Sequence, residues 1–171
     1  NVREDGDTVL LPFLPGQTLA MLLEDVALDQ RIRARAIELA VTALADFHSR
    51  GFTHGDAMAE NVLVDVDAGV ARWFDFETVH DSRRSIEWRR ADDLRALLAT
   101  CLLRSTPGTF SGTLQLVLGG YAGIGVKRIV REHCASVWHR ALTFHLGQAP
   151  LSFGAYRALQ RAVLSVSASP P

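Results

Sequence analysis

The 171-residue sequence predicts one domain of the α+β class that is mostly helical, with a small antiparallel hairpin near its middle. Three observations lead to this expectation. Apolar residues recur at helical spacing between residues 29 and 50, two strand-like runs flank a turn at residues 67–69, and helical patterns dominate from Ala91 onward. Hydrophobic residues make up 48% of the chain and charged residues 22%, which is the composition of an ordinary globular domain.

The first expected elements are a short strand and a short helix. Residues 9–13 are apolar, and Pro12 and Pro15 restrict them to an edge strand or to the end of a strand. The Pro15-Gly16 pair indicates a turn, and Thr18 is a suitable cap for the helix that follows.

A longer helix is expected from a cap at Asp29 to about Arg50, where Gly51 ends it. One face of this helix carries a stripe that should be buried, and it includes a histidine that we interpret as a core residue. The stripe consists of Ile37, Ala40, Val41, Leu44, Phe47 and His48. After it, residues 62–66 and 70–74 alternate around the Asp67-Ala68-Gly69 turn, which predicts a hairpin.

The C-terminal half is expected to be helical over residues 91–103, 111–123, 126–146 and 152–166. Cys101 and Cys134 lie in apolar helical patterns, so we expect buried free thiols, a reducing compartment and a cytoplasmic location. The net charge of -1 argues against nucleic acid as a partner. No apolar run is long enough to predict a transmembrane segment, and peripheral membrane association stays open.

The most informative stretch is HGDAMAEN, residues 54–61, which is followed after the predicted hairpin by FDFE, residues 74–77. Asp56 and Asn61 share one turn, and the hairpin should return the chain so that Asp75 faces them. Phosphoryl transfer needs a carboxylate that orients the acceptor hydroxyl, and it needs oxygen ligands for Mg²⁺. Each residue alone is a common turn or cap residue, but the three in this order favour a site.

These two motifs, in this order, resemble the catalytic loop and the metal-binding motif of the protein-kinase-like superfamily. The family motifs usually read H-R-D-x-x-x-x-N and D-F-G, so Gly55 and Glu77 are departures. The departures make the chain more similar to the atypical branches, which are the lipopolysaccharide-core sugar kinases, the Rio-type kinases and the aminoglycoside- or choline-type kinases. The resemblance covers roughly residues 8 to 100.

The resemblance implies ATP and Mg²⁺ as cofactors and a kinase-type transfer of the γ-phosphoryl group to a hydroxyl. It implies that Asp56 orients the hydroxyl and that Asn61 and Asp75 bind the Mg²⁺ that bridges the phosphates. His54 would support the loop structurally, and Asp93 would anchor it. Asp92 is the second match for the anchor.

The segment from residue 78 to residue 90 is short and lacks an A-P-E-like motif. Its length favours a small molecule or a glycan over a protein as the acceptor. Arg83 and Arg84, with Arg89 and Arg90, could bind an anionic acceptor. The alternative is a solvated loop and the surface of a helix N-terminus, and this alternative is the stronger one.

The resemblance divides the chain into the end of a small lobe with a hinge, residues 1–17, and a C-terminal lobe, residues 18–171. A Gly-rich loop and a strand lysine of the small lobe are not visible, and the only lysine is Lys127. Two interpretations stay open. The chain is a fragment of a phosphotransferase with little activity alone, or it is a non-catalytic kinase-like module that binds a partner protein.

Overall fold

The computed structural model describes residues 3–5, 8–10, 13–106, 108–135 and 161. Within these residues the fold is α+β and mostly helical, as the sequence predicts. The helices are α1 (Leu19–Glu24), α2 (Gln30–Ser49), the 3₁₀ turn η1 (Ala59–Asn61), α3 (Ile86–Leu103), α4 (Phe110–Gly120) and α5 (Ile124–Ala135). The strands are β1 (Arg3–Asp5), β2 (Thr8–Leu10), β3 (Gln17–Thr18), β4 (Val62–Asp65) and β5 (Val70–Trp73).

Side-chain caps decide where three of the helices begin. The Thr18 hydroxyl accepts a hydrogen bond from the backbone N–H of Met21, and the Asp29 carboxylate accepts one from Arg31, so both predicted caps are confirmed. Helix α3 begins at Ile86, and the predicted start at Ala91 is therefore wrong. The cap is Ser85, which accepts from the N–H of the residue three positions later, and charged residues in the first turn obscure the apolar periodicity.

The central sheet is antiparallel, with strand order β3-β4-β5. The hairpin of β4 and β5 is confirmed, and its register pairs Val62 with Trp73 and Asp65 with Val70. Strand β3 was not predicted because its two residues are held only by pairing with β4, about 45 positions further along the chain. This strand connects the N-terminal segment to the sheet that carries the candidate site.

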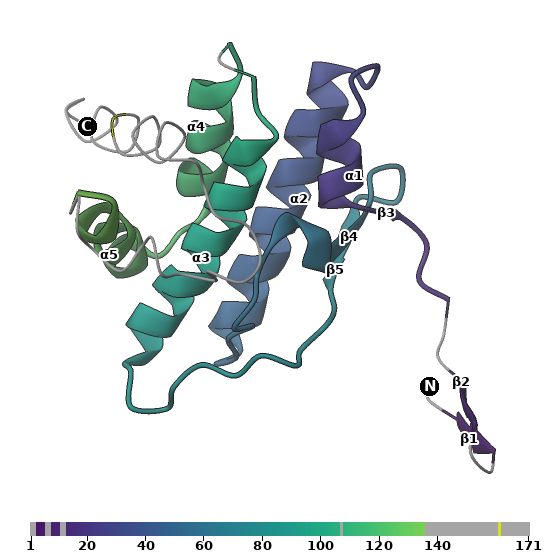
Figure 1. Cartoon of the computed structure of the whole chain (residues 1–171), viewed down its shortest axis with the longest axis horizontal. Coiled ribbons are helices and arrows are strands. Elements are labelled where there is room, and N and C mark those ends of the chain that lie inside the picture. Colours follow the sequence, from purple (N-terminus) through teal and green to yellow (C-terminus); the bar gives the residue numbers. More distant parts are fainter. Residues whose placement is uncertain (1–2, 6–7, 11–12, 107, 136–160, 162–171) are drawn as a thin grey trace.

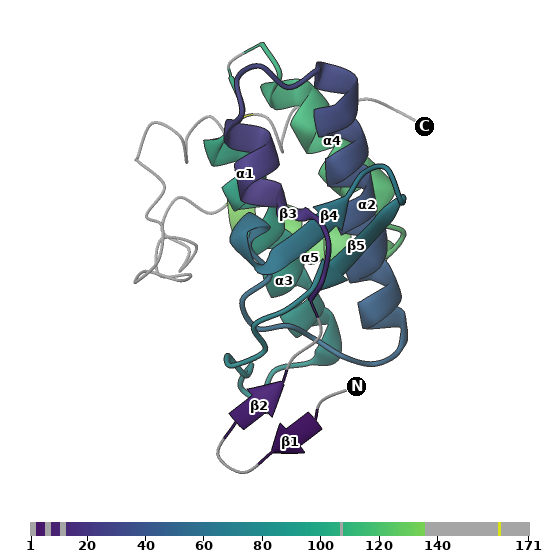
Figure 2. The same cartoon turned by 90° about the vertical axis from the view of Figure 1, so that its right-hand side faces the viewer.

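The predicted strand over residues 9–13 is wrong in its bounds. Strand β2 is Thr8–Leu10 and pairs with β1, with Arg3 opposite Leu10, while residues 11–12 lie outside the described residues. Phe13 lies outside any strand and is exposed. The small hairpin of β1 and β2 lies apart from the helices and from the central sheet in both views (Figures 1 and 2).

Helices α2 and α3 lie side by side at the centre of the fold, with α1 beside α2 and with α4 and α5 against α3 (Figure 1). The turned view shows the three-stranded sheet in front of the helices (Figure 2). Both β4 and β5 contact α2, and η1 contacts α1 and α3. The η1 turn, which leads into β4, is therefore held by α1 and α3 and is followed directly by the hairpin of β4 and β5.

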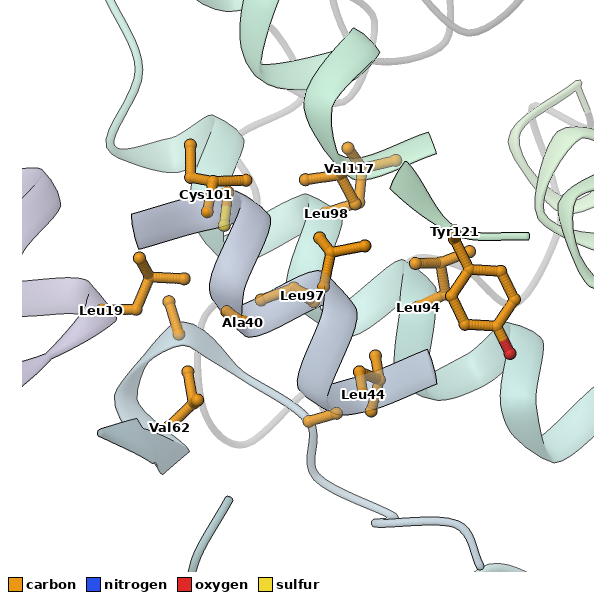
Figure 3. Packing of buried hydrophobic residues seen from close by; sticks show 14 of the residues in the cluster. Leu19, Ala40, Leu44, Val62, Leu94, Leu97, Leu98, Cys101, Val117 and Tyr121 are labelled. Carbon is orange, nitrogen blue, oxygen red and sulfur yellow. The ribbon is translucent and has the colours of Figure 1, made fainter. Parts of the chain in front are cut away.

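The hydrophobic core lies between α2, α3 and the strand β4. Leu44, Val62, Leu94 and Leu97 are fully buried there and point toward one another (Figure 3). Cys101 is a buried free thiol, as expected, and burial raises its pKa to about 12. Burial of these apolar side chains fixes α3 against α2, and this arrangement positions the acidic residues of α3 beneath the loop that follows α2.

The later helices differ from the prediction at their ends. Helix α4 ends with Gly119 and Gly120, three positions before the predicted end. Helix α5 begins at Ile124, two positions earlier than expected. The remainder of that predicted helix, the Cys134 side chain and nearly all of the helix expected at 152–166 lie outside the described residues. In the part of the chain that the structure describes, no helix has both the length and the apolar character that crossing a bilayer requires.

Candidate active site

The loop that follows α2 is anchored by one buried carboxylate on α3. Asp93 accepts hydrogen bonds from the backbone N–H groups of His54 (2.8 Å, to Oδ2) and Gly55 (2.9 Å, to Oδ1). Its Oδ2 also accepts from Nε2 of His48 at 2.9 Å. The carboxylate is 1% exposed, so these three donors replace the water that the charge has lost. This geometry agrees with the anchoring role that the resemblance implies for Asp93.

His48 is a buried core histidine whose hydrogen bonds are satisfied, as predicted. Because Nε2 faces the Asp93 carboxylate it carries the proton, and Nδ1 accepts from the Tyr121 hydroxyl at 2.7 Å. Burial raises the pKa of Tyr121 to about 12, so this hydroxyl keeps the proton that it donates. The chain of Tyr121, His48 and Asp93 links the end of α4 to α2 and α3.

His54 links the anchored loop to the segment after β5. Its Nε2 lies 2.8 Å from the carbonyl oxygen of Phe74, and its Nδ1 lies 3.3 Å from the backbone nitrogen of Asp56. A neutral imidazole with the proton on Nε2 satisfies both contacts, since it donates to the carbonyl and accepts from the N–H. Burial lowers the pKa of His54, while Phe74 and the nearby charges of Asp93, Asp56 and Asp75 act in the opposite direction.

Asp56 and Asn61 contact each other directly. The Asn61 amide nitrogen Nδ2 donates to the backbone oxygen and to Oδ2 of Asp56, both at 2.9 Å. The two residues are 6% and 7% exposed, respectively. Because both hydrogens of the carboxamide are used, its oxygen Oδ1 is the atom that could bind a cation. The turn therefore brings together two residues that have four others between them in the sequence.

Asp75 follows the residue that pairs with Asn61 at the end of the hairpin. The N–H of Phe74 donates to the carbonyl oxygen of Asn61 at 3.1 Å, which extends the pairing of Val62 with Trp73 by one step. Asp75 is exposed and has a φ of 64°, the only left-handed non-glycine residue in the described ranges. Such a backbone costs about 1 kcal/mol or more and is found often at functional sites.

The side chains of Asn61 and Asp75 offer oxygen atoms, which are the donor atoms that Mg²⁺ prefers. Within the described part of the chain, no three His, Cys, Asp or Glu side chains gather into a metal-binding group. A metal here would use one carboxylate, from Asp75, and the amide oxygen of Asn61. Mg²⁺ is bound in this way, by one or two protein oxygens together with phosphate oxygens and water.

Position 55, where the resembled motif has arginine, requires a glycine for a steric reason. Its φ is 87°, and a Cβ atom placed on it would lie 2.3 Å from the backbone oxygen of Thr78. The segment after Asp75 therefore passes directly over the anchored loop, and a larger residue at position 55 would displace it. The exposed Glu77 lies in the same crossing segment.

His80 forms a buried link between three parts of the chain. Its Nδ1 lies 3.1 Å from the Thr53 hydroxyl and its Nε2 lies 3.3 Å from a carboxylate oxygen of Asp92. Asp92 also accepts from Arg95 at 2.8 Å, so Asp92 holds this neighbouring segment and not the loop itself. The sequence carries no local signal for the two contacts of His80, which join residues 27 and 12 positions apart.

Arg83 and Arg84 lie on an exposed loop. Arg83 makes hydrogen bonds to both carboxylate oxygens of Asp81, at 2.8 to 3.1 Å, and these bonds lower the pKa of that carboxyl. The Arg84 guanidinium lies 4.9 Å from the ring centroid of Trp88. Arg90 is half-buried and donates to the carbonyl oxygen of His48, so it has a structural role. Exposure of the first two agrees with the interpretation as a solvated loop.

Among the described residues, two surface hollows are lined by other parts of the chain than the anchored loop. The larger has a volume of about 670 Å³ and lies between the end of α1, the start of α2 and the α3–α4 connection. The smaller, about 420 Å³, lies between α2 and β5. Neither is lined by Asp56, Asn61 or Asp75. The candidate site is therefore defined by the contacts of its side chains and not by either of these hollows.

Comparisons of the chain with protein-family models, with curated proteins and with solved structures find no match. The contacts around Asp56, Asn61 and Asp75 are therefore the basis on which a function can be proposed.

Replacing Gly55 by alanine should destabilise the fold by at least about 2 kcal/mol, because the new Cβ meets the Thr78 backbone in a left-handed conformation. The matched control is Gly112→Ala in α4, where nothing lies within 4 Å and alanine should change stability by less than about 1 kcal/mol. Urea unfolding of both variants measures the two free energies. Equal stabilities would contradict the close approach.

His54 should titrate below 6.5, its ordinary pKa, in the folded protein. The unfolded chain then binds more protons between the folded and the unfolded pKa, so His54 contributes stability above pH 6.5 that is lost as the pH falls through its folded pKa. Nitrogen-15 NMR of the imidazole measures both the titration midpoint and the tautomer. A midpoint above 6.5, or a proton on Nδ1 at neutral pH, would contradict the assigned hydrogen bonds.

Proposed function

We propose that the chain carries the catalytic-loop lobe of an ATP-dependent, kinase-like phosphotransferase. The reaction would transfer the γ-phosphoryl group of ATP to the hydroxyl of a small molecule or a glycan. The observation that carries this proposal is the contact of Asn61 with Asp56, together with the backbone pairing of Asn61 with Phe74, the residue before Asp75. The two sequence motifs that contain Asp56, Asn61 and Asp75 are the ones that resemble the kinase motifs.

Each residue has a distinct task in the proposed reaction. Asp56 accepts a hydrogen bond from the acceptor hydroxyl and orients its oxygen for in-line attack on the γ-phosphorus. Asn61 holds the Asp56 carboxylate through Nδ2, and it holds the metal through Oδ1 together with Asp75. Bound Mg²⁺ would neutralise the charge on the phosphates. His54 stays neutral and keeps the Asp56 backbone in place.

The proposal favours a small acceptor because the segment after Asp75 is short and tied down. Thr78 lies against Gly55, and His80 contacts both Thr53 and Asp92. Arg83 and Asp81 close a turn directly afterwards. Little backbone remains for docking an extended peptide, whereas a small molecule or a single sugar needs only the space near Asp56.

The first test uses the protein encoded by the complete reading frame around this chain. Asp56→Asn keeps the shape of the side chain but removes its charge, and it should lower phosphoryl transfer from radiolabelled ATP by about 100-fold or more. The acceptors are amino sugars, simple sugars and choline-like alcohols, assayed in parallel. The control is Asp67→Asn, at an exposed turn residue, which should leave the rate unchanged.

Two outcomes would contradict the proposal. If Asp56→Asn transfers phosphate as fast as the parent protein, Asp56 does not orient the acceptor. If the parent protein binds ATP but transfers phosphate to none of the acceptors, to water or to itself, the alternative of a non-catalytic kinase-like binding module is favoured.

A further inference from the structure

Helix α3 and its C-cap residue contact the candidate loop at three positions on one side of the helix. Asp93, Thr100 and Arg104 are separated by seven and then four residues, which returns them to the same side of an α-helix. Asp93 holds the beginning of the loop, at His54 and Gly55. The other two residues hold its end.

Thr100 binds the first residue of the η1 turn. Its hydroxyl oxygen accepts a hydrogen bond from the N–H of Ala59 at 3.0 Å and donates back to α3, to the carbonyl oxygen of Ala96 at 2.9 Å. Thr100 is 3% exposed, so water does not compete for this contact. An N–H group at the start of a 3₁₀ turn needs such an outside partner, and Thr100 supplies it.

Arg104 binds the second residue of the same turn. Its Nη2 lies 2.6 Å from Oε1 of Glu60, its Nε lies 2.9 Å from Oε1 of Glu24, and its Nη1 donates to the carbonyl oxygen of Thr100. The Arg104 side chain is only 16% exposed. The Glu60 side chain is 39% exposed, and this ion pair distinguishes it from an unpaired surface acid. Its other oxygen, Oε2, is buried and has no hydrogen-bond partner among the described residues.

The two ion pairs of Arg104 differ in their surroundings. The Glu24 side chain is 61% exposed, so solvent screens that pair and its contribution is small. The Glu60 pair is more sheltered, and the planar guanidinium is fixed by its other bonds. Glu60 directly precedes Asn61 in η1. A movement of Glu60 would therefore turn the Asn61 carboxamide that holds Asp56 and that is proposed to bind the metal.

We propose that Arg104 is a positioning residue for the phosphotransfer reaction. By holding Glu60, it fixes the orientation of η1 and so the direction in which Asn61 presents its amide oxygen to Mg²⁺. This inference rests on the proposed function. If Arg104 served only in folding, its variants would lose stability, but a folded variant would reach half-maximal rate at the same Mg²⁺ concentration as the parent.

The test measures the Mg²⁺ dependence of phosphoryl transfer by the full reading-frame protein at saturating ATP, and also the affinity of Mn²⁺ for the same protein with a non-hydrolysable ATP analogue. Arg104→Gln should raise the Mg²⁺ concentration for half-maximal rate by about 10-fold, the usual effect of losing a residue that orients a metal ligand. Glu60→Gln removes the same ion pair from the other side and should raise it similarly. The matched control is Glu24→Gln, which breaks only the exposed pair and should leave the Mg²⁺ dependence unchanged.

Arg104→Lys keeps the positive charge and should recover part of the loss. Circular dichroism melting identifies any variant that does not fold. If Arg104→Gln does not fold, the Mg²⁺ dependence of Glu60→Gln tests the inference. An unchanged Mg²⁺ dependence in the folded Arg104 and Glu60 variants of an active parent would overturn this inference alone. A parent protein without transfer activity would overturn the proposed function and this inference with it.

Discussion

The Asp93 carboxylate is the interaction on which the rest of the site depends. Burying a charged carboxylate is costly unless hydrogen bonds replace its lost water, and here three donors do so. Two of the donors are successive backbone N–H groups, at His54 and Gly55. Their arrangement around one carboxylate fixes the course of the chain as it leaves α2, and the position of Asp56 follows from it.

The remaining contacts extend this constraint along the loop. Asp93 and Arg104 are 11 residues apart, which corresponds to about 16 Å of helix. Over this length α3 holds the loop at its start through Asp93 and at its end through Thr100 and Arg104. A loop tied at both ends to one rigid helix keeps its inner residues in place, as a site for phosphoryl transfer requires.

The sequence predicts those features that are decided by neighbouring residues. The caps at Thr18 and Asp29 are local hydrogen bonds, and the hairpin of β4 and β5 has a local turn, so all three were predicted correctly. The start of α3 was missed because its cap, Ser85, lies in a charged segment without an apolar stripe. Strand β3 was missed because two residues carry too little pattern to indicate a strand.

Contacts between distant residues explain the other omissions. The bonds of His80 to Thr53 and Asp92 join separate segments, and no periodicity in the sequence indicates them. The ion pair of Arg104 with Glu60 was also missed, although the helical spacing from Asp93 to Arg104 could have suggested a common face. Gly55 was recognised as a departure from the motif, but its cause, the Thr78 backbone, is visible only in three dimensions.

Paramagnetic NMR tests whether Asn61 and Asp75 bind a metal ion next to Asp56, as we propose. Mn²⁺ in place of Mg²⁺, added at low concentration with a non-hydrolysable ATP analogue, should broaden the backbone amide signals of residues 61 and 75 first. The exposed acids Asp46 and Asp67 serve as internal references for non-specific binding. Broadening that appears equally at these references, or that is absent from Asn61 and Asp75, would contradict the account.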